Sequence, residues 1–334
     1  MSSATLNTDI LHHTLALLPA SSLATSLLAS KDFYRLCSPL LWREVELDLG
    51  KEGVEHPLVK ALIAGSRSEV HGDGWSTSPA PYVRHLTPLA HTNASPCSHI
   101  HPPVSTSGPH TNPLPNLITL HLTIHPSSPV GWSFCAPSDR ERYPIYPATL
   151  PCPLLEILRP RRLVISQVRG LVSPTPFRKG CGVWEDVREV VVRLRVGGGM
   201  WSVKGNNCFW EMLGDKVERI VVVVDDLKGR ALPFEGEKIV KDIRDRVVPL
   251  ALKRGISILV VNLPVSPQNF EMAGSRDGYA KGDVGDVMVE GEGEKGEIKF
   301  ETMEGWLKTG QWVGVFSQQE VKVLDYYSQP SFNQ

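Results

Sequence analysis

Apolar side chains recur at helical spacing through the first forty residues. Thr8 and Asp9 can cap and open a helix whose apolar positions run from Ile10 to Leu18, and Pro19 ends it. Two further short helices are expected, one capped by Ser21 or Ser22 and carrying Leu23, Leu27 and Leu28, the next carrying Phe33, Tyr34 and Leu36 before Pro39. Three short helices bury little apolar surface, so we expect them to need a partner or a following domain.

After Trp42 the pattern changes to that of strands. Val45, Leu47 and Leu49 alternate with acidic residues, which is typical of a strand with one face in water. Apolar runs then recur at uneven spacing and each predicts a buried strand: Leu117 to Ile124, Arg162 to Val168, Val187 to Val196, Val217 to Val224 and Ile256 to Leu263. Helix-like segments are Pro57 to Ala64, Phe209 to Leu213 and Glu237 to Lys253. Strands that alternate with helices predict parallel β/α units.

Three segments are expected to be rich in loops. Residues 66–115 contain much Ser, Pro, Gly, His and Thr, with one strand-like run from Tyr82 to Leu89, and prolines recur in 126–153. Residues 273–299 are rich in Gly and charge and predict a mobile loop. The apolar residues of the tail are expected to pack back onto the domain; these are Trp306, Trp312, Val313, Val315 and Phe316.

Two fragments have the spacing of a leucine-rich repeat. LPNLITLHLTI at 114–124 places Leu117, Leu120 and Leu122 as a repeat strand would, and CPLLEILRPRRLVI at 152–165 has a similar beginning. The spacing between strands is too uneven for a regular solenoid, but a degenerate array tolerates such insertions. We expect an irregular leucine-rich-repeat-like domain with a mostly parallel sheet.

The segment LNTDILHHTLALLPASSLATSLLASKDFYRLCSPLLWREVELD at 6–48 resembles the F-box. The likeness rests on the order and spacing of Leu6, Ile10, Leu15, Leu18-Pro19, Leu23, Leu28-Ala29-Ser30, Phe33 and Leu41-Trp42. Asn7 stands where the family usually has Pro, and Asp9 where Glu is more common. The resemblance implies a three-helix module that docks a substrate receptor onto the Skp-family adaptor of a cullin–RING ubiquitin ligase.

The resemblance also implies which residues contact the adaptor. The candidates are Leu6, Ile10, Leu18, Pro19, Leu23, Leu41 and Trp42, acting as a few apolar anchors in grooves of the adaptor. The same leucines would alternatively form the core of the helical module. Residues 1–50 would then be the F-box-like module and residues 51–334 the domain that recognises a protein substrate, with specificity in the loops at 66–115 and 126–153.

Acidic and basic residues nearly balance, so the chain as a whole has little electrostatic attraction to a charged partner. Lys and Arg number 35 against 36 Asp and Glu, a formal net charge of −1, so binding to nucleic acid or to a membrane surface is not expected. No apolar run is long enough to span a membrane, and the N-terminus lacks the pattern of a secretory signal. The six cysteines are widely scattered, as for reduced thiols. A cytoplasmic or nuclear location is expected.

Candidate chemistry is sparse. Cys97, His99, His101 and His110 share one polar stretch, but their spacing matches no standard zinc site. The glycines at 197–199 lack the pattern of a phosphate loop, and Asp225-Asp226 follows an apolar strand without an identifiable catalytic partner. The basic clusters at 159–162 and 241–254 are interleaved with acids. We therefore expect no catalytic residue, no metal and no cofactor.

The sequence predicts an α/β protein: a three-helix F-box-like module followed by an irregular leucine-rich-repeat-like domain. The expected function is that of a substrate adaptor of a Skp–cullin–F-box ligase rather than an enzyme. Two alternatives stay open. One is an interaction scaffold that does not support ubiquitination. The other is an α/β enzyme or ligand-binding protein with an unrelated helical N-terminus, which would have a deep polar pocket at the carboxyl ends of its strands.

Overall fold

Three short helices open the chain in the computed structural model. They are α1 (Thr8–Ala16), α2 (Ala20–Leu27) and α3 (Lys31–Leu41). Ser30 caps α3 by accepting a hydrogen bond from the backbone N–H of Phe33 at 3.2 Å. The structure describes residues 8–49, 56–64, 78–89, 91–92, 112–123, 135–136, 152–168, 181–195, 213–225, 243–262, 286–291, 294–316 and 320–322.

Two details of these helices differ from expectation. Helix α2 begins at Ala20, directly after Pro19, so neither Ser21 nor Ser22 caps it. Pro19 has the extended backbone of a residue that precedes a helix. Helix α3 continues through Pro39 to Leu41. Proline lacks only one backbone donor, and the apolar residues on both sides of Pro39 pack in the same cluster, which keeps the last turn helical.

A nine-stranded sheet forms most of the rest of the molecule. Its strands are β1 (Glu44–Leu47), β2 (His85–Pro88), β4 (Thr119–Thr123), β6 (Arg162–Val168), β7 (Glu189–Arg195), β8 (Arg219–Asp225), β9 (Ser257–Val261), β11 (Glu294–Glu301) and β10 (Asp286–Gly291), in that spatial order. The first eight in this order are parallel, and only β10 is antiparallel to its neighbour β11. From β1 to β9 the spatial order of the described strands is also the order along the chain.

Five of the described parallel strands, β2, β4, β6, β7 and β8, begin in the same way. The backbone N–H groups of Arg84 and His85 both donate to the carbonyl oxygen of Arg43, and those of Ile118 and Thr119 both donate to the carbonyl of Arg84. The same paired bonds recur at the carbonyls of Ile118, Arg161 and Arg188, with N···O distances between 2.8 and 3.2 Å. Each unit therefore repeats the backbone geometry of the one before it.

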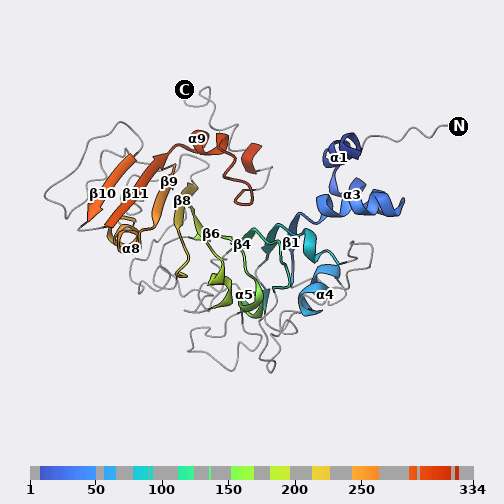
Figure 1. Ribbon diagram of the computed structural model, residues 1–334, viewed down its shortest axis with the longest axis horizontal. Coiled ribbons are helices and arrows are strands. Elements are labelled where there is room, and N and C mark those ends of the chain that lie inside the picture. The colour runs from blue at the N-terminus through green and yellow to red at the C-terminus, as the bar shows by residue number, and fades with distance from the viewer. Residues whose placement is uncertain are drawn as a thin grey trace.

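One face of the sheet carries the main apolar core. Leu86, Leu120, Leu163, Val190 and Ile220 occupy equivalent positions on neighbouring strands and are fully buried. The covering elements are α4 (Pro57–Ala64), η1 (Ala80–Tyr82), α5 (Pro153–Ile157), η3 (Gly182–Glu185), the single π-helical turn η4 (Ile243–Val247) and α8 (Val248–Arg254). In Figure 1 α4, α5 and α8 lie on this side of the sheet, and the C-terminal helix α9 (Met303–Lys308) lies on the other.

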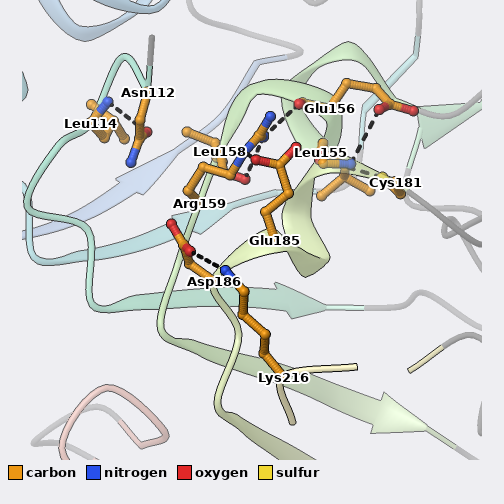
Figure 2. A network of polar contacts seen from close by, with 11 residues as sticks. Asn112, Leu114, Leu155, Glu156, Leu158, Arg159, Cys181, Glu185, Asp186 and Lys216 are labelled. Atoms are coloured by element: carbon orange, nitrogen blue, oxygen red, sulfur yellow. Dashed lines mark hydrogen bonds and ion pairs between the residues drawn. The ribbon is translucent and has the colours of Figure 1, made fainter. Parts of the chain in front are cut away.

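Polar contacts join neighbouring units on the helical side of the sheet (Figure 2). Arg159, which follows α5, is only 8% exposed, and its Nε donates to Glu185 of η3 at 2.7 Å. Its Nη1 also donates to the carbonyl of Glu156 at 2.6 Å. Lys216, in the next unit, forms an ion pair with Asp186, which follows η3, at a distance of 3.2 Å. Arg159 is therefore a structural residue that holds successive units together.

Most of the expected elements are present. The predicted strand from Arg162 to Val168 has the same bounds as β6, and α4 has the bounds predicted from the sequence. The run from Tyr82 to Leu89 gives the end of η1 followed by β2. A separate two-stranded parallel sheet pairs β3 (His91–Thr92) with β5 (Cys135–Ala136), within segments expected to be rich in loops.

The expectation of a mobile loop over the whole of 273–299 is wrong. Residues 286–291 and 294–301 form β10 and β11, and β11 extends the sheet by pairing with β9. The composition is poor in apolar residues, but Ile298 is buried in the main core and the exposed edge of β9 supplies backbone partners. Tertiary pairing here overrides a weak local signal.

Candidate interaction surfaces

The helical module has a small core of its own. Leu15, Leu23 and Cys37 are buried in it, and the residues packed around them are Leu11, Leu18, Leu27, Phe33, Leu36, Leu40 and Leu41. Burial raises the pKa of the Cys37 thiol, which keeps it protonated. Among the residues expected to contact an adaptor, Leu23 therefore lies inside the module, and Leu18 and Leu41 are partly buried against the same cluster.

Three apolar side chains of the module face water instead. Ile10 is 57% exposed, Leu17 is 86% exposed and Leu28 is 87% exposed. Ile10 belongs to the first turn of α1, and Leu17 directly follows the last residue of that helix. Of these three residues only Ile10 was among the predicted contact residues. The signal for the others was available, because Leu17-Leu18 and Leu27-Leu28 are adjacent pairs that cannot both face one core.

Trp42 lies where the module meets the sheet. It is half-buried against the main core of the sheet, and its ring makes an edge-to-face contact with His56 at a centroid distance of 6.2 Å. Pro19 is exposed at the start of α2, and Leu6 lies outside the described residues. The structure thus separates the seven predicted contact residues into different environments. Of the six that belong to the described part of the chain, only Ile10 and Pro19 are exposed at the surface.

The second face of the sheet is covered by the C-terminal segment of the chain, residues 303–316 and 320–322. Trp306 and Phe316 of this segment are buried and meet edge to face at 5.8 Å. They belong to a second apolar cluster with alternate residues of the central strands, namely Val164, Val191, Val221, Val223, Leu259 and Val261. The tail therefore packs onto the domain as predicted, and it occupies the face that an open solenoid would offer to a partner.

Arginines of the sheet hold this segment in place. Arg162 donates to the carbonyl of Val313 at 2.9 Å, and Arg219 donates to Oε1 of Gln311 at 3.0 Å. Arg193 is buried, donates to the carbonyl of Val315 at 3.1 Å and lies 4.0 Å from the centroid of the Phe316 ring. Its guanidinium also pairs with Glu320 at 2.9 Å. Glu189, between Arg162 and Arg219, pairs with both.

Two histidines lie beside this segment. Burial, together with the positive charges of Arg43, Arg162 and Arg84, lowers the pKa of His85 from 6.5 to about 4. Burial also lowers the pKa of His121 to about 4, with Arg193 acting in the same direction and Glu320 against it. Nε2 of His121 lies 2.8 Å from the hydroxyl oxygen of Ser166. Both rings are therefore neutral at pH 7.

Gly314 allows the segment to approach these strands. Its φ of +78° is in the left-handed region, and a Cβ placed on it would lie 2.6 Å from Nδ1 of His85 and 2.9 Å from Oγ1 of Thr119. Both contacts are shorter than a side-chain carbon tolerates, so a glycine is needed here for two separate reasons.

The remaining candidate chemistry of the sequence gains no support. Cys97, His99, His101 and His110 lie outside the described residues, as do the glycines at 197–199. Within the described ranges no group of three or more His, Cys, Asp or Glu side chains is arranged to hold a metal ion. No described helix combines the length and the apolar character that a membrane crossing requires.

Comparisons with known proteins do not assign a class. No protein-family profile matches the sequence, and no curated protein is significantly similar to it.

Proposed function

We propose that this chain is an adaptor that joins two proteins, with its helical module docking onto a Skp-family adaptor of a cullin–RING ubiquitin ligase. The observation that carries the proposal is the exposure of Ile10, Leu17 and Leu28 on a module of three short helices at the β1 end of the sheet (Figure 1). Large apolar side chains exposed on so small a module are candidates for burial by a partner. The resemblance of residues 6–48 to the F-box suggests which partner that is.

The sheet supports the second half of the proposal. From β1 to β9 the described strands follow one another in chain order, and those from β2 to β8 begin with the same paired backbone bonds, as in the stacked units of a degenerate leucine-rich array. Such arrays bind proteins over extended surfaces. In this proposal the sheet domain binds a target protein and presents it for ubiquitin transfer, and no residue of this chain is catalytic.

The topology also favours an interaction protein over an α/β enzyme. Doubly wound enzymes bind ligands where the strand order reverses, because the loops there diverge and leave a crevice. From β1 to β9 the described strands contain no such reversal. The scaffold alternative has the same fold, and measuring the half-life of captured targets with and without this protein would separate it from a ligase adaptor.

The decisive experiment is calorimetric titration of the full chain with a purified Skp-family adaptor. We expect binding that weakens at least about tenfold in Ile10→Ser plus Leu17→Ser plus Leu28→Ser, because central apolar anchors each contribute more than about 1 kcal/mol. The substituted side chains are exposed, so the circular dichroism spectrum should not change. Leu41 and Trp42 are less suitable targets, because both pack in apolar clusters of the protein.

The matched control is Ile63→Ser on α4, a large apolar side chain that is 39% exposed but lies on the sheet domain. It should bind the adaptor as the wild type does. A wild-type chain that is folded and does not bind, or a triple variant that binds with unchanged affinity, would refute the docking proposal.

A further inference from the structure

An uninterrupted row of exposed side chains runs across the beginnings of the first four strands. It consists of Arg43, Arg84, Ile118 and Arg161, each of which immediately precedes a strand. Their carbonyl oxygens accept the paired backbone bonds described above, which fixes the four residues side by side on neighbouring strands. Neighbouring strands lie about 4.8 Å apart, so the row spans about 14 Å.

The charges of this row are not neutralised within the described part of the chain. No carboxylate there forms an ion pair with Arg43, Arg84 or Arg161, and a positive field is felt by His85, whose pKa is lowered partly by Arg43 and Arg84. The next position along this edge, at the start of β7, is different. There Arg188 pairs with Glu218 at 2.5 Å. The excess of positive charge is therefore confined to the β1–β6 end.

Ile118 lies between the arginines and is 37% exposed; among the described residues outside the helical module, Ile63 is the other large apolar side chain that is exposed. A partner that is complementary to the row has an apolar group opposite Ile118 and negatively charged groups on both sides of it, opposite the arginines. A nucleic acid fits less well, because the row contains no aromatic side chain on which a base could stack. An extended peptide rises about 3.3 Å per residue, so four or five residues would cover the row.

We infer that the row formed by Arg43, Arg84, Ile118 and Arg161 binds an acidic segment of a protein partner, with carboxylates at the arginines and an apolar side chain at Ile118. This inference deepens the proposed function by naming the class of target that the sheet domain takes. It also explains how a target is reached although the C-terminal segment covers the second face of the sheet. The row remains open because it lies at the edge where the strands begin.

The test is fluorescence anisotropy of the full chain with a labelled peptide in which two glutamates flank a leucine on each side. A second peptide has glutamine in place of every glutamate. We expect the glutamate peptide to bind and the glutamine peptide to bind at least about tenfold more weakly, with affinity falling as salt is raised. Arg43→Gln plus Arg84→Gln plus Arg161→Gln should weaken binding of the glutamate peptide about tenfold.

Arg188→Gln is the matched control, because Arg188 occupies the equivalent position on β7 but is already paired with Glu218. It should bind the glutamate peptide with wild-type affinity. Equal binding of the two peptides, or an unchanged affinity in the triple arginine variant, would overturn the inference. So would displacement of the peptide by millimolar inorganic phosphate at constant ionic strength, which would identify a simple anion site.

The same preparations are titrated with the Skp-family adaptor. Adaptor binding by the triple arginine variant together with loss of peptide binding supports both proposals. Adaptor binding without any peptide binding by the wild type overturns the acidic-target inference alone, and peptide binding without adaptor binding refutes the docking proposal alone.

Discussion

At the scale of single residues, the packing of the C-terminal segment against the sheet depends on Gly314, which has no side chain. Gly314→Ala should destabilise the protein by about 2 to 4 kcal/mol, because alanine pays about 1 to 2 kcal/mol for the left-handed backbone and the new Cβ also overlaps His85 and Thr119. The measurement is the free energy of unfolding in urea. Thermal melts of the same proteins should rank them in the same order.

Gly310 provides the control for that substitution. Its φ is +71°, but a Cβ there would have no atom within 4 Å. Gly310→Ala should therefore cost only the backbone contribution. If both variants lose the same stability, the close approach of Gly314 to the sheet is refuted.

The two partly buried histidines, His85 and His121, make stability depend on pH. Both have a pKa of about 4 in the folded protein against an ordinary 6.5, so between these values the unfolded chain binds protons that the folded chain does not. The stability contributed by the neutral rings is therefore complete above pH 6.5 and is lost as the pH falls toward 4. We expect the melting temperature to fall between pH 6.5 and 5.

The charged neighbours that set these pKa values are Arg43, Arg84 and Arg162 for His85, and Arg193 and Glu320 for His121. The variant His85→Gln plus His121→Gln should lose most of the decline between pH 6.5 and 5. A decline that persists unchanged in this variant would show that other groups cause it.

At the scale of elements, the C-terminal segment covers one face of the sheet and is held there by a few buried side chains. Trp306→Ala should cost about 3 to 5 kcal/mol, because the indole is 1% exposed and its removal leaves a cavity against Phe316 and the sheet. Hydrogen exchange should accelerate in residues 303–316 more than in β7 and β8. Trp312→Ala, at a half-buried position of the same segment, should have a smaller effect; an equal loss would contradict the anchoring role of Trp306.

Strands and helices were predictable where the local pattern and the tertiary environment agree. Within β6 the residues Leu163 to Ile165 are buried on both faces of the sheet and form a continuous apolar run, and the strand predicted around them is correct. The β10–β11 hairpin was missed because its pairing comes from the edge of β9 rather than from its own composition. The continuation of α3 through Pro39 depends likewise on packing that the local sequence does not show.

At the scale of the whole molecule, the parallel sheet could be predicted, but its second layer could not. The apolar tail from Trp306 to Phe316 was expected to pack back, yet nothing in its sequence indicates which face it covers. The arginines that hold it are separated from their partners by more than ninety positions; Arg193 and Val315 are one such pair. Which apolar side chains of the helical module are exposed was only partly predictable, since helical spacing alone does not tell Leu23, which is buried, from Leu28, which is exposed.

The agreement between strand order and chain order also bears on how such a protein can vary. Each unit pairs with the units immediately before and after it, so a longer connection between two strands leaves every hydrogen-bonded register unchanged. The thermodynamic penalty for the extra chain is small, about 0.6 kcal/mol for each doubling of a flexible loop. Insertions of very different length can therefore accumulate between strands, and this accounts for the irregular spacing of the apolar runs. New segments can be acquired or lost during evolution while the framework that displays them persists.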